Sequence, residues 1–282
     1  MLINKELLKQ TLLKRSPYSH KGDYGHLLLL CGCESMPGAA VLATGAALKS
    51  GCGLVTLHST PRALQAAVTV CPSAMLSEDA GSCITMLPAD LSRYSAIGIG
   101  PGIGRDPATQ NVVHCLLEQA NEARIPMLID ADALNILSLH KDWFDKIPSG
   151  SVMTPHDGEL RRLTDWDGLV ARELAAKELC ERTGCVVVMK GFGSQVLTPT
   201  GMKYTNTTGN AGLAKGGSGD VLSGLLAGLM ARGYEAATAA AMAVWIHGYA
   251  ADCLTDRCTA EAYSSNELID NLFNGFSQLY SA

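Results

Sequence analysis

The hydrophobic positions of the chain fall into short apolar runs that alternate with longer stretches rich in alanine and leucine. Continuous apolar runs are typical of strands in a parallel sheet that is covered on both faces. Such runs are "HLLLLCG" from His26, "LVTLHS" from Leu54, "AIGIG" from Ala96 and "CVVVMKG" from Cys185. The longer stretches predict helices, two of which we expect to be capped at Gly51 and Gly184. The alternation predicts a mostly parallel α/β sheet with helices on both faces.

The same alternation continues through the second half of the chain. A strand is predicted from Pro126, and the chain turns into a helix at Asp130 to Asp132 in the stretch "IPMLIDADALNIL". A hairpin that turns at Pro199 to Gly201 is predicted for "SQVLTPTGMKYTNTTG". Two consecutive helices follow, "DVLSGLLAGLMARG" and "YEAATAAAMAVWIHGYAADCL". Because we find no linker, repeat or low-complexity segment, residues 1–282 are predicted to form one domain.

Composition and charge exclude several classes of protein. Hydrophobic residues make up 47% of the chain and charged residues 17%, as in a well-buried globular protein. A net charge of −5 without a basic stripe argues against a nucleic-acid partner. The most apolar long stretch, "AATAAAMAVWIHGYAA", is too short for a membrane span and is interrupted by His247. The ten cysteines contain no CxxC pair, so we expect free buried thiols in a cytoplasmic protein and no zinc site.

The stretch "GNAGLAKGGSGD" ends on an acid that opens an apolar helical run. Its last glycines place the backbone N–H groups of Gly217, Ser218 and Gly219 at a helix N-terminus, which is a geometry that binds anions. Asp220 is either a first-turn acid that favours the helix dipole or the acceptor of a hydroxyl proton in phosphoryl transfer. In the second case, the carboxylate and the phosphate would lie on opposite sides of the attacked oxygen.

Three further motifs follow predicted strands, at the edge where ligands bind open α/β sheets. In "MKGFGS", Lys190 is either a charge for a phosphate or part of an ordinary strand-end turn. In "MTPHDGEL", His156 is either structural or exposed toward a cleft, with Glu159 one helical turn on. In "LIDADALNIL", Asp130 and Asp132 suit Mg²⁺ or a ribose, although Asp132 is equally suited to be the N-cap of the helix containing Asn135. The glycines of "GIGPGIGRD" give only a weak Rossmann pattern.

Taken in order, these motifs resemble those of the ADP/ATP-dependent NAD(P)H-hydrate dehydratases, a branch of the ribokinase-like superfamily. The resemblance runs from about His20 to about Ala251. It rests on "HKGDYG", "MPGAAVLATGAALKSGCGLV", "GIGPGIG", "LIDADALNIL", "MTPHDGE", "VVVMKG" and "GNAGLAKGGSGDVLSG". It implies a ribokinase-like fold, without the N-terminal epimerase domain that some members carry. It also implies repair of the hydrated dinucleotides NADHX and NADPHX, driven by ADP or ATP with Mg²⁺, in a homotetramer.

The resemblance assigns roles to particular residues. Asp220 matches the acid of the family's GxGD motif, which would deprotonate or orient the C6 hydroxyl of the hydrated ring, with Gly217 to Gly219 as the anion hole. Glu159 would help organise Mg²⁺. The adenine nucleotide would contact Lys190, Gly191, Phe192, Gly193, Ser194 and Gly219, and the hydrated dinucleotide would contact Ala39, Gly104, His156 and Asp220. Lys215 departs from the family pattern, and it would either reach a phosphate or face solvent.

Two other functions remain open at this point. A small-alcohol kinase of the same superfamily, acting on a hydroxymethylpyrimidine or a hydroxyethylthiazole, would share the sheet, the anion hole and Asp220. The runs "TPHDGE" and "MPGAA" favour the dehydratase. A non-catalytic nucleotide sensor is the third possibility, and Asp220 argues against it because a carboxylate beside a phosphate site adds nothing to binding.

Overall fold

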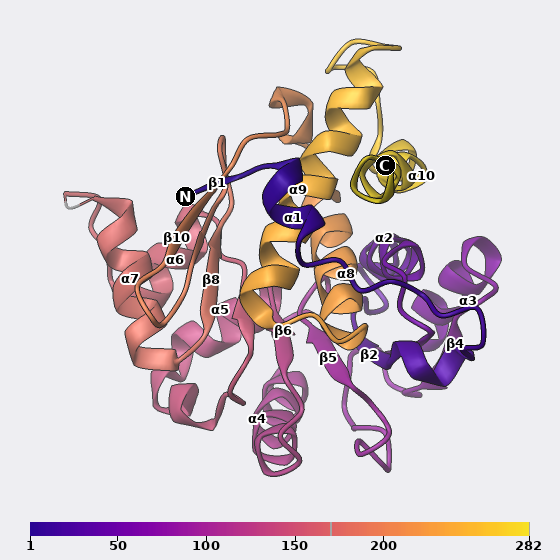
Figure 1. The fold of residues 1–282 in the computed structure, drawn as a ribbon. Helices are drawn as coiled ribbons and strands as arrows, with labels where there is room; N and C mark the ends of the chain where they lie inside the picture. The colour runs from indigo at the N-terminus through magenta and orange to yellow at the C-terminus, as the bar shows by residue number, and fades with distance from the viewer. Residues whose placement is uncertain (170, 282) are drawn as a thin grey trace.

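The chain folds around one ten-stranded sheet in the computed structural model, which describes residues 1–169 and 171–281 (Figure 1). The strand order is β1-β10-β9-β8-β7-β6-β5-β2-β3-β4. The strands are β1 (Leu2–Ile3), β2 (His26–Leu30), β3 (Leu54–Ser59), β4 (Met75–Glu78), β5 (Ala96–Ile99), β6 (Met127–Ile129), β7 (Val152–Met153), β8 (Val186–Met189), β9 (Gln195–Leu197) and β10 (Lys203–Asn206).

Strand pairing is parallel from β8 to β4, and β9 and β10 form an antiparallel hairpin on β8. The first strand, β1, lies parallel to β10 at the outer edge, with Leu2 opposite Thr205. The terminal ammonium of Met1 donates to the Lys203 carbonyl at 2.8 Å. After β2 the chain adds β3 and β4 on one side, and after β5 it adds β6 to β8 on the other side. The loops that follow β2 and β5 therefore diverge between these two strands. Such a switch point is where ligands bind in open α/β sheets.

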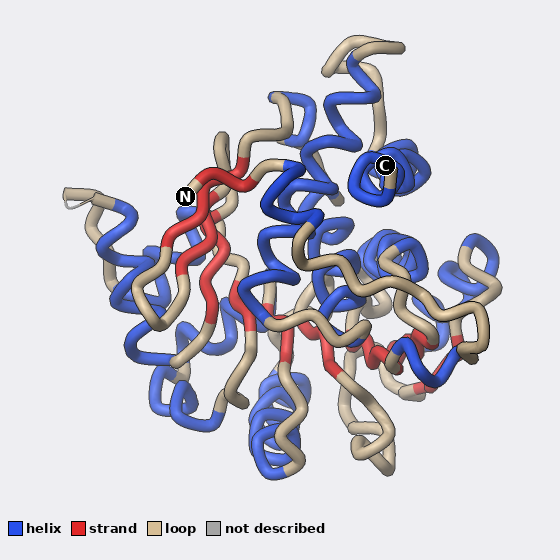
Figure 2. Tube along the Cα trace, viewed as in Figure 1, coloured by secondary structure: helices blue, strands red, loops and turns tan. Residues whose placement is uncertain are grey.

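Helices cover both faces of the sheet, and the strands run between the two layers (Figure 2). Two separate apolar clusters of buried side chains fill the space on either side. The first layer contains α1 (Lys5–Lys9), α2 (Pro37–Lys49), α3 (Pro61–Val70), α8 (Ser218–Ala231), α9 (Ala236–Thr255) and α10 (Ser265–Tyr280). The second contains α4 (Pro107–Glu122), α5 (Ala131–Leu139), α6 (Asp157–Thr164) and α7 (Arg172–Thr183).

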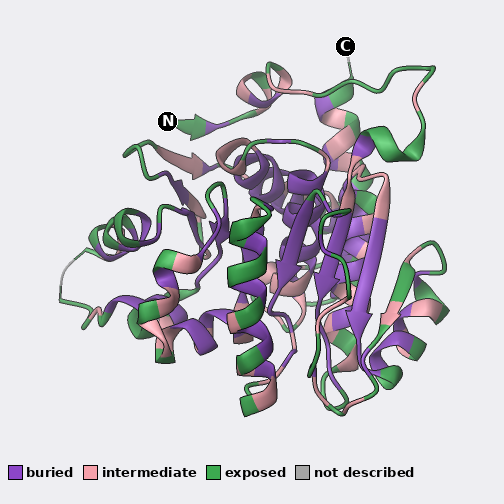
Figure 3. Ribbon diagram, turned by 90° about the horizontal axis from the view of Figure 1, so that it is seen from below, coloured by how far each residue is buried: buried purple, intermediate pink, exposed green. Residues whose placement is uncertain are grey.

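The central helices α8 and α9 are buried almost throughout, whereas the outer helices keep one exposed face (Figure 3). Small residues make this possible, because they let helix backbones approach closely. A Cβ built on Gly224 of α8 would lie 1.9 Å from the carbonyl oxygen of Ala43 in α2. Within the described residues, no helix combines the length and the apolarity that a membrane crossing requires. The alanine-rich stretch that contains His247 is therefore a core helix, as its small residues predict.

The predicted fold class is confirmed, since the sheet is mostly parallel and helices lie on both of its faces. Several boundaries were wrong. Pro37 starts α2 instead of belonging to the preceding turn, because a helix needs no N–H at its first position. The C-cap of α2 is Ser50, and Gly51 follows it with a φ of 87°. The predicted strand "HLLLLCG" is too long, since β2 ends at Leu30 and Cys31 lies beyond it. The sequence analysis missed β1, β4, α1, α3 and α10.

The α2–α8 contact yields a prediction about stability. We expect Gly224→Ala to lower the free energy of unfolding by roughly 2–3 kcal/mol, because the added methyl overlaps the Ala43 backbone and the helices must separate. Gly38→Ala is the matched control, since a Cβ at Gly38 meets nothing within 4 Å. Urea denaturation of both variants measures the difference. Equal stability of the two variants would contradict the close packing of α2 against α8.

Candidate active site

The glycine-rich loop forms the N-terminus of α8, as predicted. Gly217 is the N-cap with a φ of 88°, and a Cβ there would lie 2.4 Å from Leu42 Cδ1, so the position requires glycine. Among the described residues, the amides of Gly219 and Asp220 have no hydrogen-bond acceptor. The Ser218 amide donates to the Lys215 carbonyl at 3.4 Å, so the prediction that its N–H is free was wrong. The remaining amides point out of the helix and can bind an anion.

A cavity of about 650 Å³ opens beside these amides, a volume typical of small-molecule sites. Ser218 and Gly219 line it, together with the whole predicted nucleotide segment from Lys190 to Ser194. The structure thus brings together the two motifs that the resemblance assigns to the adenine nucleotide. Other lining residues were missed by sequence reasoning, because no local motif marks them: Asn206, Thr208, Val244, His247 and Gly248.

Behind the cavity, the ammonium of Lys190 lies between two buried carboxylates. Its Nζ is 2.7 Å from Asp130 Oδ1 and 3.7 Å from Glu159 Oε2. The hydroxyl of Ser223, on α8, donates to the other oxygen of Asp130. Burial alone would lower the pKa of Lys190, but the negative charges of Asp130 and Glu159 outweigh it and raise that pKa. Lys190 is therefore a charged group that joins the ends of β6 and β8 to α8 and to the start of α6.

The predicted metal ligands are engaged by this lysine. Both oxygens of Asp130 are occupied by Lys190 and Ser223, and Glu159 accepts a hydrogen bond from the His156 amide at 2.9 Å. Across residues 1–169 and 171–281, no group of three or more His, Cys, Asp or Glu side chains is arranged to hold a metal ion. The arrangement therefore does not provide a protein-only Mg²⁺ cage at Asp130 and Glu159.

The alternative N-cap role for Asp132 was wrong, since the N-cap of α5 is Asp130.

Asp220 lies in the same first turn of α8, but it does not line the cavity. Ser218 and Gly219 are among the described lining residues, whereas Asp220 is not. Burial, together with the charge of Asp130, raises the pKa of Asp220 to about 6 against the opposing effect of Lys190. A carboxyl group with this pKa accepts a proton readily near neutral pH, which suits a general base. The amides that can bind an anion and this acid are thus brought together in one helix turn.

The predicted dinucleotide contacts lie at the switch point between β2 and β5. Ala39 is in the first turn of α2, and a Cβ built on Gly102 would lie 2.7 Å from the Ala39 Cβ, so the two loops touch. The amide of Gly104 donates to Asp132 Oδ2 at 3.0 Å. A Cβ built on Gly104 meets nothing within 4 Å, so this loop faces open space. The charge of Asp132 also contributes to the raised pKa of Asp220, which places the acid on this side.

His156 is the N-cap of α6, and its Nδ1 accepts from the amides of Gly158 and Glu159 at 2.9 and 3.3 Å. These contacts fix the ring orientation, and the half-exposed side chain lines the cavity beside Lys190. His156 is therefore both a structural N-cap and a residue exposed toward the cavity, so the two interpretations of the sequence are compatible. Its place on the nucleotide side, however, separates it from Ala39 and Gly104.

Two residues around the loop have structural roles that the sequence did not disclose. Lys215 lines the cavity, but its ammonium donates to the carbonyls of Ala260 and Tyr263 at 3.1 and 2.5 Å. His247 donates from Nε2 to the Ser218 carbonyl at 3.0 Å. Burial lowers the pKa of His247 to about 4, so the ring is neutral at physiological pH and fixes the Ser218 backbone. In sequence, His247 is only an interruption of an apolar stretch.

Known structures define the class of this fold. A ribokinase-like superfamily protein from Enterococcus faecalis superposes with a TM-score of 0.85 at 24% identity, over 98% of this chain and 95% of that one. The Bacillus subtilis ADP/ATP-dependent NAD(P)H-hydrate dehydratase, co-crystallised with ATP and Mg²⁺, superposes with a TM-score of 0.84 at 31% identity. That match covers 99% of this chain and 98% of the other. The protein has a ribokinase-like fold.

Sequence comparison identifies the family. The family model described as NAD(P)H-hydrate dehydratase matches residues 27–274. The ADP-dependent (S)-NAD(P)H-hydrate dehydratase of B. subtilis is 35% identical over 274 residues, covering 95% of this chain and 94% of the relative. The bifunctional NAD(P)H-hydrate repair enzyme Nnr of Moorella thermoacetica is 35% identical over 280 residues, and this chain spans about half of it, 51%. The chain belongs to the NAD(P)H-hydrate dehydratase family, which confirms the resemblance drawn from its motifs.

The raised pKa of Asp220 predicts a cost in stability. A carboxyl group whose pKa is raised from 3.8 to about 6 by folding adds stability that is complete below pH 3.8 and is lost as the pH rises through 6. We therefore expect Asp220→Asn to stabilise the protein at pH 8 by on the order of 1 kcal/mol, after allowance for solvent screening. The gain should shrink toward zero near pH 4.5. Urea denaturation at both pH values measures it, with the exposed Asp270→Asn as control; an equal gain at both would contradict the pKa.

The Lys190 cluster makes a second prediction. Lys190→Met keeps the alkyl chain but leaves Asp130 and Glu159 buried without a counter-ion, so we expect a loss of roughly 3–5 kcal/mol at pH 8. The pKa of Asp130 is now held below its usual range because Lys190 and Ser223 outweigh the effect of burial. The loss should therefore diminish as the pH falls and the carboxylates take up protons.

Lys177→Met is the matched control for Lys190→Met, because Lys177 forms an exposed ion pair with Glu181 at 3.7 Å. Such pairs contribute a few tenths of a kcal/mol. Denaturation of both variants in urea at pH 8 and pH 5 separates the two environments. A similar small loss in the two variants would show that Lys190 does not neutralise buried charge.

Proposed function

We propose that the protein is an ADP-dependent (S)-NAD(P)H-hydrate dehydratase that returns NADHX and NADPHX to NADH and NADPH. One observation carries the proposal: the first turn of α8 combines two amides without an acceptor among the described residues, those of Gly219 and Asp220, with a carboxyl group, that of Asp220, whose pKa is raised to about 6. An anion site and a base so placed suit phosphoryl transfer to a hydroxyl. The name and length of the B. subtilis relative support the hydrated dinucleotide as the acceptor.

In this proposal, the adenine nucleotide occupies the cavity lined by Lys190 to Ser194, with its terminal phosphoryl group on the amides of Gly219 and Asp220. The hydrated nicotinamide lies against Ala39 and Gly104. Asp220 takes the proton of the C6 hydroxyl as its oxygen attacks phosphorus, and AMP leaves. Phosphate then departs from C6 while C5 loses a proton, which restores the ring double bond. The sum is ADP plus hydrated dinucleotide giving AMP, phosphate and the reduced dinucleotide.

The amides stabilise the transition state rather than the substrate. Negative charge on the transferring group is spread over its oxygens, and pre-oriented N–H donors at a helix N-terminus stabilise it without rearrangement. Lys190 contributes a fixed positive charge close by, since a Cβ built on Gly219 would lie 3.8 Å from its Nζ. Because Asp130 and Glu159 already bind that ammonium, we infer that Lys190 acts on the phosphate through its field rather than by moving to it.

We propose that Mg²⁺ reaches the site with the nucleotide. Magnesium in phosphoryl-transfer sites is commonly held by substrate phosphates and water with few protein ligands. This agrees with the engagement of Asp130 and Glu159 by Lys190. The relative from B. subtilis was co-crystallised with ATP and Mg²⁺, and it is named for ADP, so we propose that both nucleotides bind and that ADP is the substrate.

A cytoplasmic location and a homotetramer remain predictions. Light scattering after size-exclusion chromatography measures the assembly directly. The small-alcohol kinase differs from the proposed activity in its acceptor and in leaving the phosphate on its product, so the substrate assay separates the two.

We expect the purified protein to restore the absorbance of reduced nicotinamide from NADHX in the presence of ADP and Mg²⁺, releasing AMP. Asp220→Asn should reduce kcat by roughly a hundredfold to ten-thousandfold, as for other general bases, and should leave the dissociation constant of ADP within about twofold. Asp270→Asn, on the exposed face of α10, is the control.

Absence of recovery with both ADP and ATP would refute the dehydratase. Phosphorylation of a hydroxymethylpyrimidine or a hydroxyethylthiazole in its place would establish the kinase. Full turnover by Asp220→Asn would remove the carboxylate from the proposed proton transfer, while leaving the activity itself in place.

A further inference from the structure

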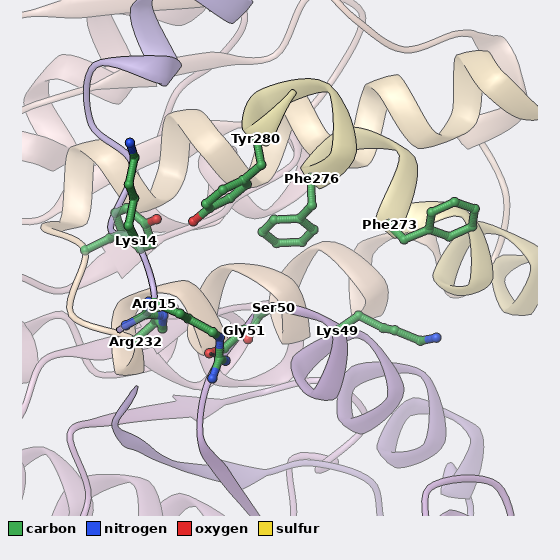
Figure 4. Close-up of a pocket in the computed structure, with 10 residues that line it drawn as sticks. Lys14, Arg15, Lys49, Ser50, Gly51, Arg232, Phe273, Phe276 and Tyr280 are labelled. Carbon is green, nitrogen blue, oxygen red and sulfur yellow. Dashed lines mark hydrogen bonds between the residues drawn. The ribbon is translucent and has the colours of Figure 1, made fainter. Parts of the chain in front are cut away.

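A second cavity of about 650 Å³ lies at the opposite end of α8 from the anion site (Figure 4). It is bounded by the segment after α1, the ends of α2 and α8, and α10. Since α8 has 14 residues, the two cavities are separated by roughly 20 Å along its axis. None of the catalytic residues that the family motifs predict lines this cavity.

The lining of this cavity is strongly basic. Four cationic side chains line it, and no Asp or Glu does so among the described residues: Lys14, Arg15, Lys49 and Arg232. None of the four forms an ion pair with a carboxylate in the part of the chain that the structure describes. This concentration of uncompensated positive charge stands against a net charge of −5 for the whole chain. Unpaired clustered cations attract anionic ligands.

The two arginines are held in place on the floor of the cavity. Their guanidinium carbons lie over the ring of Tyr24, Arg15 at 4.0 Å and Arg232 at 4.1 Å from its centroid. Arg15 Nη2 donates to the Gly51 carbonyl at 2.6 Å, and Arg232 Nη2 donates to the Leu13 carbonyl at 3.1 Å. Each guanidinium keeps further N–H groups, because arginine carries five donors. Fixed, planar guanidinium groups are well suited to phosphate oxygens.

Aromatic rings form the facing wall. Phe276 and Tyr280 are four residues apart on α10, so they share one face of that helix, and Figure 4 shows their rings on the side opposite Arg15 and Arg232. The Tyr280 hydroxyl donates to the Leu13 carbonyl at 3.0 Å, which fixes its ring. Lys14 and Lys49 extend from the rim, with their ammonium groups outermost (Figure 4). A ligand between these walls would meet cations on one side and apolar rings on the other.

Helix capping explains only part of this arrangement. Both α2 and α8 end beside the cavity, and cations stabilise helix C-termini. Arg15 serves the end of α2 in this way through the Gly51 carbonyl. Arg232, in contrast, donates to the loop carbonyl of Leu13, and Lys14 lies on no helix. Capping also requires no open volume, whereas this cavity is as large as the nucleotide cavity.

We propose that this cavity is a second ligand site that binds an organic phosphate carrying a planar ring, separately from the catalytic cavity. The phosphate would lie on the guanidinium groups of Arg15 and Arg232, with Lys14 and Lys49 closing over it from the rim. The ring would lie against Phe276 and Tyr280. Charge-assisted hydrogen bonds fix the anion, and ring contacts select against inorganic phosphate.

Pyridoxal 5′-phosphate is a probe of this chemistry that also reports position. Its aldehyde condenses with a lysine amine and releases water, and borohydride reduces the resulting C=N bond to a stable amine. Labelling at a low probe-to-protein ratio, followed by peptide mass spectrometry, identifies the lysines next to a bound phosphate. We expect Lys14 and Lys49 to be labelled at least about fivefold more than the exposed Lys21 and Lys177, and excess pyridoxine 5′-phosphate to protect them better than inorganic phosphate.

Two variants test the walls of the site separately. Arg232→Gln removes one phosphate contact and Phe276→Ala removes one ring contact, and each should lower the labelling of Lys14 and Lys49 by roughly tenfold. Arg62→Gln, at an exposed arginine of α3 that pairs with Glu34, should leave the labelling unchanged. Circular dichroism verifies that each variant is folded.

Uniform labelling of exposed lysines would overturn the proposal, as would labelling confined to Lys190 and Lys215 at the catalytic cavity. Selective labelling that survives both variants would also overturn it. Each of these results is independent of the dehydratase assay, because the peptide map reports the site without any turnover.

Discussion

The buried contact between Lys190 and Asp130 is the interaction around which the catalytic region is built. The two residues are 60 positions apart, at the ends of different parallel strands, and their charged atoms are 2.7 Å apart. Ser223 attaches α8 to the same carboxylate, and Glu159 adds the start of α6. The direction of α8, and therefore of its free amides, depends on this shared contact. A buried ion pair seldom adds net stability, but it restricts the groups around it to few arrangements.

The charge balance around the pair explains why phosphate and carboxylate coexist in one site. Asp130, Glu159 and Asp220 together carry more negative charge than Lys190 can neutralise, and burial prevents water from screening the excess. Burial is the largest cause of the raised pKa of Asp220, and the excess negative charge raises that pKa as well. In the proposed mechanism, the phosphoryl group lies on the backbone N–H groups of the same helix turn.

Sequence patterns predicted the structural features that depend on residues close together in the chain. Glycine spacing placed the loop at the start of α8, and apolar runs placed the strands around the site, because turns and periodicity are local. Contacts between distant segments were not predictable: Lys190 was interpreted as a phosphate ligand, and its two carboxylate partners were interpreted as metal ligands. His247 was seen only as an interruption of a helix, since its partner Ser218 lies 29 positions away. The basic cavity gave no signal, because four segments far apart in sequence form it.

The pairing of β1 with β10 has a consequence for engineering the protein. Ile3 accepts a hydrogen bond from Thr207 at 2.7 Å, next to Asn206 and Thr208 of the nucleotide cavity. A tag or domain joined ahead of Met1 would replace the terminal ammonium that donates to Lys203 and would continue from this edge of the sheet. Its first residues would lie against the segment that shapes the cavity, so the linker sequence would influence nucleotide affinity. Fusion at the opposite terminus would instead extend from α10, beside the basic cavity.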